Sequence, residues 1–152
     1  MARHVFFPMA MVMAVIFAAV GATSAAAAGD GVHRLIIPVD EGDPARMKLA
    51  LMNTKAVAGH YLDKGEDYEI EVLAYGPGLA MLRADISPVK EMVTMLTEAY
   101  GNVSFRACGN SHTLAAEREG REIPLLPGVT KVPSGVVHLV QRQEEGWSYV
   151  RP

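Results

Sequence analysis

The chain has 152 residues, a mildly acidic net charge of −3 and a single cysteine, Cys108. The acidity and the lack of any Lys/Arg cluster argue against a nucleic-acid-binding protein. One cysteine excludes an internal disulfide, a CxxC redox pair and a cysteine-based zinc cluster, so stability has to come from an ordinary hydrophobic core.

The first 28 residues have the composition of a secretory signal peptide. Arg3 is followed by an apolar run over residues 5–20 and then by small residues that end in four alanines. We expect cleavage near Ala26 to Ala28, because the alanines offer a peptidase site and no basic stop-transfer cluster follows. A permanent membrane anchor is the alternative, since the apolar run is nearly long enough to span a bilayer. Cleavage predicts a periplasmic protein without a membrane anchor.

Residues 29–152 then form a single domain. The signal removes one basic residue and no acid, which leaves this domain with a net charge of −4. Residues 35–39 are an apolar run typical of a buried strand, followed by the loop DEGDP, whose last Asp and Pro suit the start of a helix. A helical stripe that ends near residues 59–65 leads to a second strand over 68–75, closed by the turn GPG at 76–78.

The second half of the chain repeats this alternation. After a short helix over 79–83 and a longer one from 87 to 100, a third strand covers residues 103–108. Asn110 or Ser111 is expected to cap a helix that ends near residue 119. A short strand over 129–132 precedes a helix over 136–144, and residues 147–150 form a last strand. The apolar positions of the 136–144 helix are Val136, Val137, Leu139 and Val140.

Strands that alternate with helices predict an α/β fold with a mostly parallel sheet covered on both faces. In such sheets ligands bind at the carboxyl ends of the strands, at the crevice where strand order reverses. Four turns are expected to gather at that edge, within residues 40–43, 76–78, 108–112 and 133–135.

Cys108 is the leading candidate for a functional residue. It ends the third strand just before a helix N-terminus, where free backbone N–H groups and the helix dipole favour a thiolate. We expect a lowered pKa and a sulfur that is exposed to the cleft. His112, inside the first helical turn, and Asn110 are candidate hydrogen-bond partners of a bound sulfur species. The alternative is that Cys108 is a small apolar residue that completes a buried strand.

Other polar groups give weaker signals. The acids of the 40–43 loop suit helix capping and solvent better than a cation site, and Ser134 suits a helix cap because the G-x-S-x-G motif is absent. His33, His60 and His138 fall in three different elements, so we expect no metal site from them. Trp147 and Tyr149 indicate core or subunit contact. We expect no cofactor.

Several spaced motifs resemble the exported branch of the DsrE/DsrF-like family. The run ACGNS at 107–111 is accompanied by LLPGV at 125–129 and VPSGVV at 132–137. The loop DEGDP, the turn YGPG and the terminal WSYVRP fit the same branch, so the resemblance covers essentially all of residues 29–152.

The resemblance implies a three-layer α/β/α sandwich with a parallel five-stranded sheet, assembled into homotrimers or hexamers. It also implies that Cys108 accepts sulfane sulfur as a persulfide, together with a sulfur donor or acceptor protein. The function expected is therefore periplasmic sulfur handling, whether or not the protein is itself an enzyme. The alternatives are a non-catalytic oligomeric interaction module, in which Cys108 serves packing, and a thiol redox sensor.

Overall fold

A computed structural model describes residues 31–152, so the expected signal peptide over residues 1–28 lies outside the described residues. Within residues 31–152 one parallel sheet has the strand order β4-β3-β2-β1-β5. The strands are β1 His33–Val39, β2 Tyr68–Ala74, β3 Val103–Cys108, β4 Thr130–Val132 and β5 Ser148–Tyr149. The helices are α1 Pro44–Lys64, α2 Lys90–Ala99, α3 Gly109–Glu119, α4 Gly135–Glu144 and the 3₁₀ helix η1 Gly76–Leu82.

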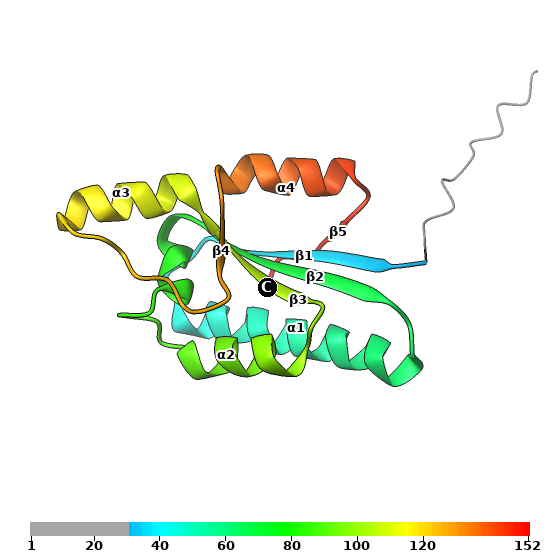
Figure 1. Cartoon of the computed structure of the whole chain (residues 1–152). Helices are drawn as coiled ribbons and strands as arrows, with labels where there is room; N and C mark the ends of the chain where they lie inside the picture. The colour runs from blue at the N-terminus through cyan, green and yellow to red at the C-terminus, as the bar shows by residue number, and fades with distance from the viewer. Residues whose placement is uncertain (1–30) are drawn as a thin grey trace, which may run out of the picture.

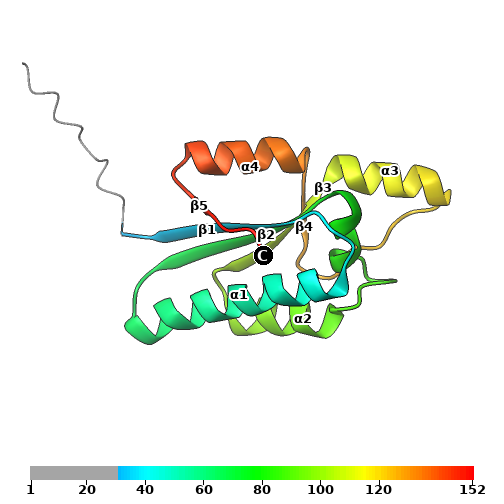
Figure 2. The same cartoon turned by 180° about the vertical axis from the view of Figure 1, so that it is seen from behind.

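Helices cover both faces of the sheet, as the alternation of elements predicts. Helices α1 and α2 lie on one face, and α3 and α4 lie on the other (Figures 1 and 2). The protein is therefore a three-layer α/β/α fold. None of the helices among the described residues has the length and apolar character needed to cross a membrane.

The first crossover shows how the sequence sets these elements. Asp43 precedes α1, and its side chain accepts a hydrogen bond of 2.9 Å from the backbone N–H of Ala45. Pro44 is the first helical residue, where its missing N–H costs nothing. Gly65 ends the helix in the left-handed conformation, with φ of 67°, which glycine adopts without steric cost. Both predicted ends of this helix are confirmed.

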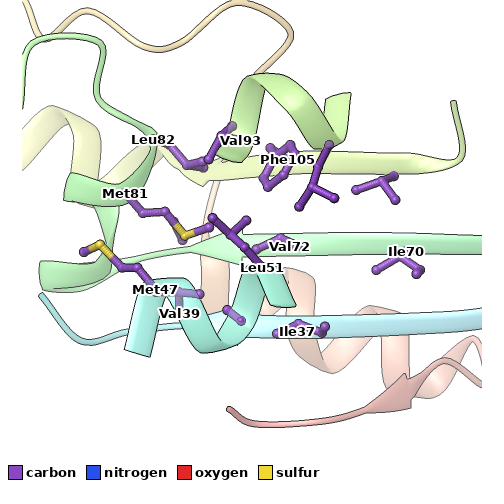
Figure 3. Close-up of a cluster of buried hydrophobic side chains, with 14 of the residues drawn as sticks. Ile37, Val39, Met47, Leu51, Ile70, Val72, Met81, Leu82, Val93 and Phe105 are labelled. Atoms are coloured by element: carbon purple, nitrogen blue, oxygen red, sulfur yellow. The ribbon is translucent and has the colours of Figure 1, made fainter. Parts of the chain in front are cut away.

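The hydrophobic core is uneven between the two faces. The larger cluster lies between the sheet and α1, α2 and η1, where side chains such as Leu51, Val72 and Phe105 interdigitate (Figure 3). The cluster under α4 is small, and α3 has no buried side chain. The buried residues of the cluster under α4 are Ile36, Leu73, Val132, Leu139 and Trp147. The α3/α4 layer therefore depends less on apolar packing than the α1/α2 layer does.

The starting point of α3 differs from the prediction. Cys108 is the N-cap residue and α3 begins at Gly109, so Asn110 and Ser111 lie inside the first turn and neither caps the helix. The hydroxyl of Ser111 has different partners, Gly76 and the sulfur of Cys108.

The buried face of α4 also differs from the prediction. Of the four apolar positions only Leu139 is buried, whereas Val136, Val137 and Val140 are exposed. The face toward the sheet consists instead of Gly135, His138, Leu139 and Arg142, which share one side of a helix at this spacing. The physical reason is a buried acid on β2, Glu71, which bonds to His138 and Arg142.

Candidate functional site

The turns that follow the strands meet at the carboxyl edge of the sheet, as expected. After β2, the N–H of Gly76 donates a 2.8 Å hydrogen bond to the hydroxyl oxygen of Ser111 in α3. After β4, the N–H of Gly135 donates to the sulfur of Cys108 at 3.2 Å. The hydroxyl of Tyr75 lies 3.5 Å from the Asp40 carboxylate that follows β1. The strand order reverses between β1 and β5, however, so Cys108 at the end of β3 lies away from that crevice.

The sulfur of Cys108 is surrounded by hydrogen-bond donors. They are the hydroxyl and backbone N–H of Ser111 and the backbone N–H groups of Asn110 and Gly135. Because the Ser111 oxygen accepts from Gly76, its own hydrogen is free to point at the sulfur. Donors from the segments after β3 and β4 thus converge on one atom, and the turn after β2 contributes only through its hydrogen bond to Ser111.

These donors decide the ionisation of the thiol. Burial raises the pKa of Cys108, but the hydrogen bonds from Ser111, Gly135 and Asn110 favour the thiolate and outweigh burial, so the pKa is lowered from its usual value. The lowered pKa agrees with the expectation from the helix N-terminus.

Two glycines allow the backbone to come this close to the sulfur. A Cβ at Gly135 would lie 3.0 Å from Cβ of Tyr75 and 3.2 Å from Cβ of Cys108. A Cβ at Gly109 would lie 3.0 Å from the carbonyl oxygen of Val132. Such contacts are tighter than side chains normally make, so glycine is needed where α4 begins against the thiol.

The expected exposure of the sulfur is wrong, because Cys108 is only 5% exposed. The start of α4 lies against it, since the N–H of Gly135 bonds to the sulfur. A reagent therefore reaches the sulfur only past neighbouring groups of the site.

The two candidate partners of the thiol have different positions. Asn110 contributes its backbone N–H to the sulfur, and its side chain is exposed. His112 has its Nε2 atom 2.9 Å from the carbonyl oxygen of Ile123. The hydrogen bond that the structure gives to His112 therefore joins α3 to the following loop, and the side chain that bonds to the sulfur is Ser111.

Several of the weaker candidates have structural partners. Asp40 and Glu41 pair with Arg151 near the C-terminus, as an exposed charge cluster. His33 pairs with Glu66, and His138 with Glu71. Within residues 31–152 there is no group of three or more His, Cys, Asp or Glu side chains that could hold a metal ion.

Sequence reasoning missed a buried charge cluster beside the site. Glu71, in the middle of β2, is 3% exposed and accepts hydrogen bonds from Arg106 at 3.1 Å and from Arg142 at 2.9 and 3.1 Å. Nε2 of His138 lies 2.6 Å from the same carboxylate. The signal was an acid inside one apolar strand and a base, Arg106, inside the neighbouring strand.

This cluster holds α4 in place. Burial raises the pKa of Glu71, but the hydrogen bonds from Arg142 and His138 and the charge of Arg106 outweigh it, so the pKa is lowered and the carboxylate is ionised. The guanidinium of Arg142 also lies 4.7 Å from the centre of the Trp147 ring. Two of the partners of Glu71 come from α4, the helix whose first N–H group binds the thiol.

Replacing Ser111 with alanine tests the hydrogen-bond account of the thiol. We expect Ser111→Ala to raise the pKa of Cys108, because a donor that favours the thiolate is lost. The ultraviolet absorbance of the thiolate, followed against pH, measures this value for one group, since the chain has one cysteine. Ser104→Ala is the control, because that hydroxyl bonds to the Ile70 carbonyl on β2. An unchanged midpoint in Ser111→Ala would contradict the account.

Replacing Glu71 with glutamine tests the anchoring of α4. Because the carboxylate is more acidic in the folded than in the unfolded chain, it stabilises the fold above its usual pKa of 4.5, and this stabilisation is lost as the pH falls through the lower folded value. We expect Glu71→Gln to lower the free energy of unfolding by about 3 kcal/mol near neutral pH.

The difference from wild type should then narrow as the solution is made more acidic than the usual carboxyl pKa. Denaturant unfolding over a series of pH values measures both effects. Glu69→Gln is the matched control on the same strand, because its ion pair with Arg34 is exposed and costs little to lose. Equal stability losses in the two variants would contradict the anchoring role.

Comparison with known proteins finds a solved structure that is similar to this chain. No model of a protein family and no curated protein matches the sequence. The chain is similar to MTH1491, a protein of unknown function from Methanobacterium thermoautotrophicum, with a TM-score of 0.67 and 37% sequence identity. The match covers 79% of this chain and 99% of that one. The chain belongs to the same family as this protein of unknown function.

Proposed function

We propose that the protein accepts sulfane sulfur and carries it as a persulfide on Cys108. The observation that carries the proposal is the set of donors around one sulfur atom, from Ser111, Asn110 and Gly135, which lowers the pKa of a cysteine at the carboxyl edge of the sheet. A thiolate is the nucleophilic form of cysteine, so this setting favours attack on an electrophilic sulfur.

The reaction with thiosulfate illustrates the step. The Cys108 thiolate attacks the outer sulfur of thiosulfate, a new S–S bond forms, and the old S–S bond breaks with sulfite as the leaving group. The charge is conserved, because the product is a persulfide anion on Cys108 and sulfite keeps two negative charges. The donors that stabilise the thiolate also stabilise the negative persulfide.

The resemblance to the DsrE/DsrF-like family supports this chemistry and extends the proposal. By that resemblance a donor or acceptor protein exchanges sulfur with Cys108. The secretory composition of residues 1–28 supports a periplasmic location.

Sulfur loading provides the direct test. After incubation of residues 29–152 with thiosulfate or polysulfide, we expect intact mass measurement to show one added sulfur on wild type and none on Cys108→Ser. Treatment with a reducing thiol should remove the added mass, because a persulfide is reducible. No gain over the Cys108→Ser control would reject the carrier role, and oxygen addition or a dimer linked through Cys108 would favour a redox sensor.

A second candidate is a non-catalytic oligomeric interaction module, and two observations favour it. Cys108 is buried, as a packing residue would be, and α4 exposes Val136, Val137 and Val140 on its outer face. Exposed valines on one helix face are typical of a surface that meets a partner. We propose a second copy of this chain as that partner, since the family resemblance implies homotrimers or hexamers.

A charge on this face tests the oligomer. Val137 is 53% exposed, so Val137→Glu should leave the fold of the single chain stable. In the oligomer the new carboxylate would be buried between two copies without a partner, which is costly, so the variant should not assemble. Light scattering on a gel-filtered sample should show an oligomer for wild type and a monomer for the variant. Leu62→Glu on α1 is the control, an exposed apolar residue on the opposite layer. A monomeric wild type would contradict the proposal.

A further inference from the structure

A cleft lies directly beside the thiol site, between η1 and α3. The strands β2 and β3 are neighbours in the sheet. After β2 the chain turns toward the α1/α2 face and forms η1, and after β3 it turns toward the α4 face and forms α3 (Figure 1). The place where the strand order reverses lies elsewhere, between β1 and β5. The cleft between η1 and α3 has a volume of about 530 Å³, enough for a small organic molecule.

One face of α3 forms a wall of this cleft. The residues that line it from α3 recur at helical spacing and are Ser111, Leu114, Ala115, Arg118 and Glu119. Apolar side chains from η1, Leu79 and Ala80, form the opposite wall. The side chain of Leu114 is exposed at 45%, so it is available to a ligand in the cleft.

The cleft carries one uncompensated positive charge. Glu119 is neutralised by ion pairs with Arg83 and Arg121, and Arg83 also pairs with Asp85. Arg118, by contrast, has no ion pair or hydrogen bond from its side chain within residues 31–152. A guanidinium without a partner beside apolar walls suits a ligand that has both an apolar body and a negative charge.

Ser111 joins the cleft to the sulfur. Its side chain lines the cleft and also bonds to Cys108, and Gly76, which bonds to Ser111, lines the opposite side. The buried sulfur therefore lies one side chain behind the end of the cleft. A ligand in the cleft therefore approaches the sulfur past Ser111.

We propose that this cleft binds the sulfur donor, and that the donor is an organic anion whose apolar body lies between η1 and α3. This inference rests on the proposed function and adds the substrate class. Arg118 binds the negative charge, Leu114 and Ala80 contact the apolar body, and the sulfane sulfur faces Ser111. An inorganic donor such as thiosulfate can bind to Arg118 through its charge, but it has no apolar body to contact the walls of the cleft.

Benzenethiosulfonate and methanethiosulfonate are suitable probes, because they have the same charge and the same reacting group and differ in the size of the apolar body. The Cys108 thiolate attacks the terminal sulfur of benzenethiosulfonate, the S–S bond to the sulfonyl group breaks, and benzenesulfinate leaves with the bonding electrons. One persulfide anion and one sulfinate anion replace one thiolate and one thiosulfonate anion, so atoms and charge balance. Methanethiosulfonate reacts in the same way and lacks the apolar body.

The experiment compares second-order rates of sulfur loading for the two donors, each divided by the rate of the same donor with free cysteine. After this correction, we expect benzenethiosulfonate to load wild type about tenfold faster than methanethiosulfonate does. This ratio is equivalent to a difference of about 1.4 kcal/mol in free energy. Leu114→Ser should remove the preference for benzenethiosulfonate, and Arg118→Gln should slow both donors. Lys48→Gln, an exposed charge on α1, is the matched control and should change neither rate.

Failure of this inference is distinct from failure of the proposed function. Loading by both donors at equal corrected rates, or a preference that survives Leu114→Ser, would overturn the cleft as donor site and leave persulfide formation intact. Binding of benzenesulfinate, which has no sulfane sulfur, tests the cleft without any loading. Calorimetry should show binding to Cys108→Ser and weaker binding when Arg118→Gln is added, and equal affinity in the two proteins would also overturn the inference.

Discussion

The arrangement around Cys108 depends on the buried carboxylate of Glu71 in β2, the middle strand of the sheet. Burying the Glu71 carboxylate without partners would cost several kcal/mol. An acid at this position of β2 is therefore compatible with the fold only if cationic side chains bond to it. Arg106 supplies one from β3, while His138 and Arg142 bond to it from α4. This requirement fixes which side of α4 faces the sheet. The rotation of that helix places the N–H of Gly135 on the sulfur of Cys108 and leaves the valines outside.

Hydrogen-bond donors stabilise the thiolate, and no basic side chain among residues 31–152 bonds to the sulfur. The hydrogen-bond partners of Cys108 are N–H groups and a hydroxyl, and all of them donate. Hydrolytic cysteine enzymes need a base beside the thiol to take up and return protons. His112, the nearest candidate in the sequence, bonds to the Ile123 carbonyl oxygen.

Sequence patterns predicted the order of the elements well, because apolar runs and caps act locally. Asp43, Pro44 and Gly65 set the ends of α1 without help from distant residues. The pattern failed for α4, where hydropathy alone favours the valines as the buried side. The reason lies in Glu71, more than sixty positions earlier, whose role appears only when β2 and α4 are packed together. The burial of Cys108 is likewise a property of the turn after β4, which no local pattern around the cysteine reveals.

The lack of buried side chains in α3 has a consequence for motion. A helix held by surface contacts opens at a lower free energy than the core that supports it, so local unfolding concentrates there. The cysteine itself belongs to β3, which lies inside the sheet between β2 and β4. Helix α3, which supplies the Ser111 and Asn110 donors, can thus fluctuate while the strand that carries the sulfur stays fixed. Access to the reactive atom and stability of the domain are then separate properties, and each can change by mutation without the other.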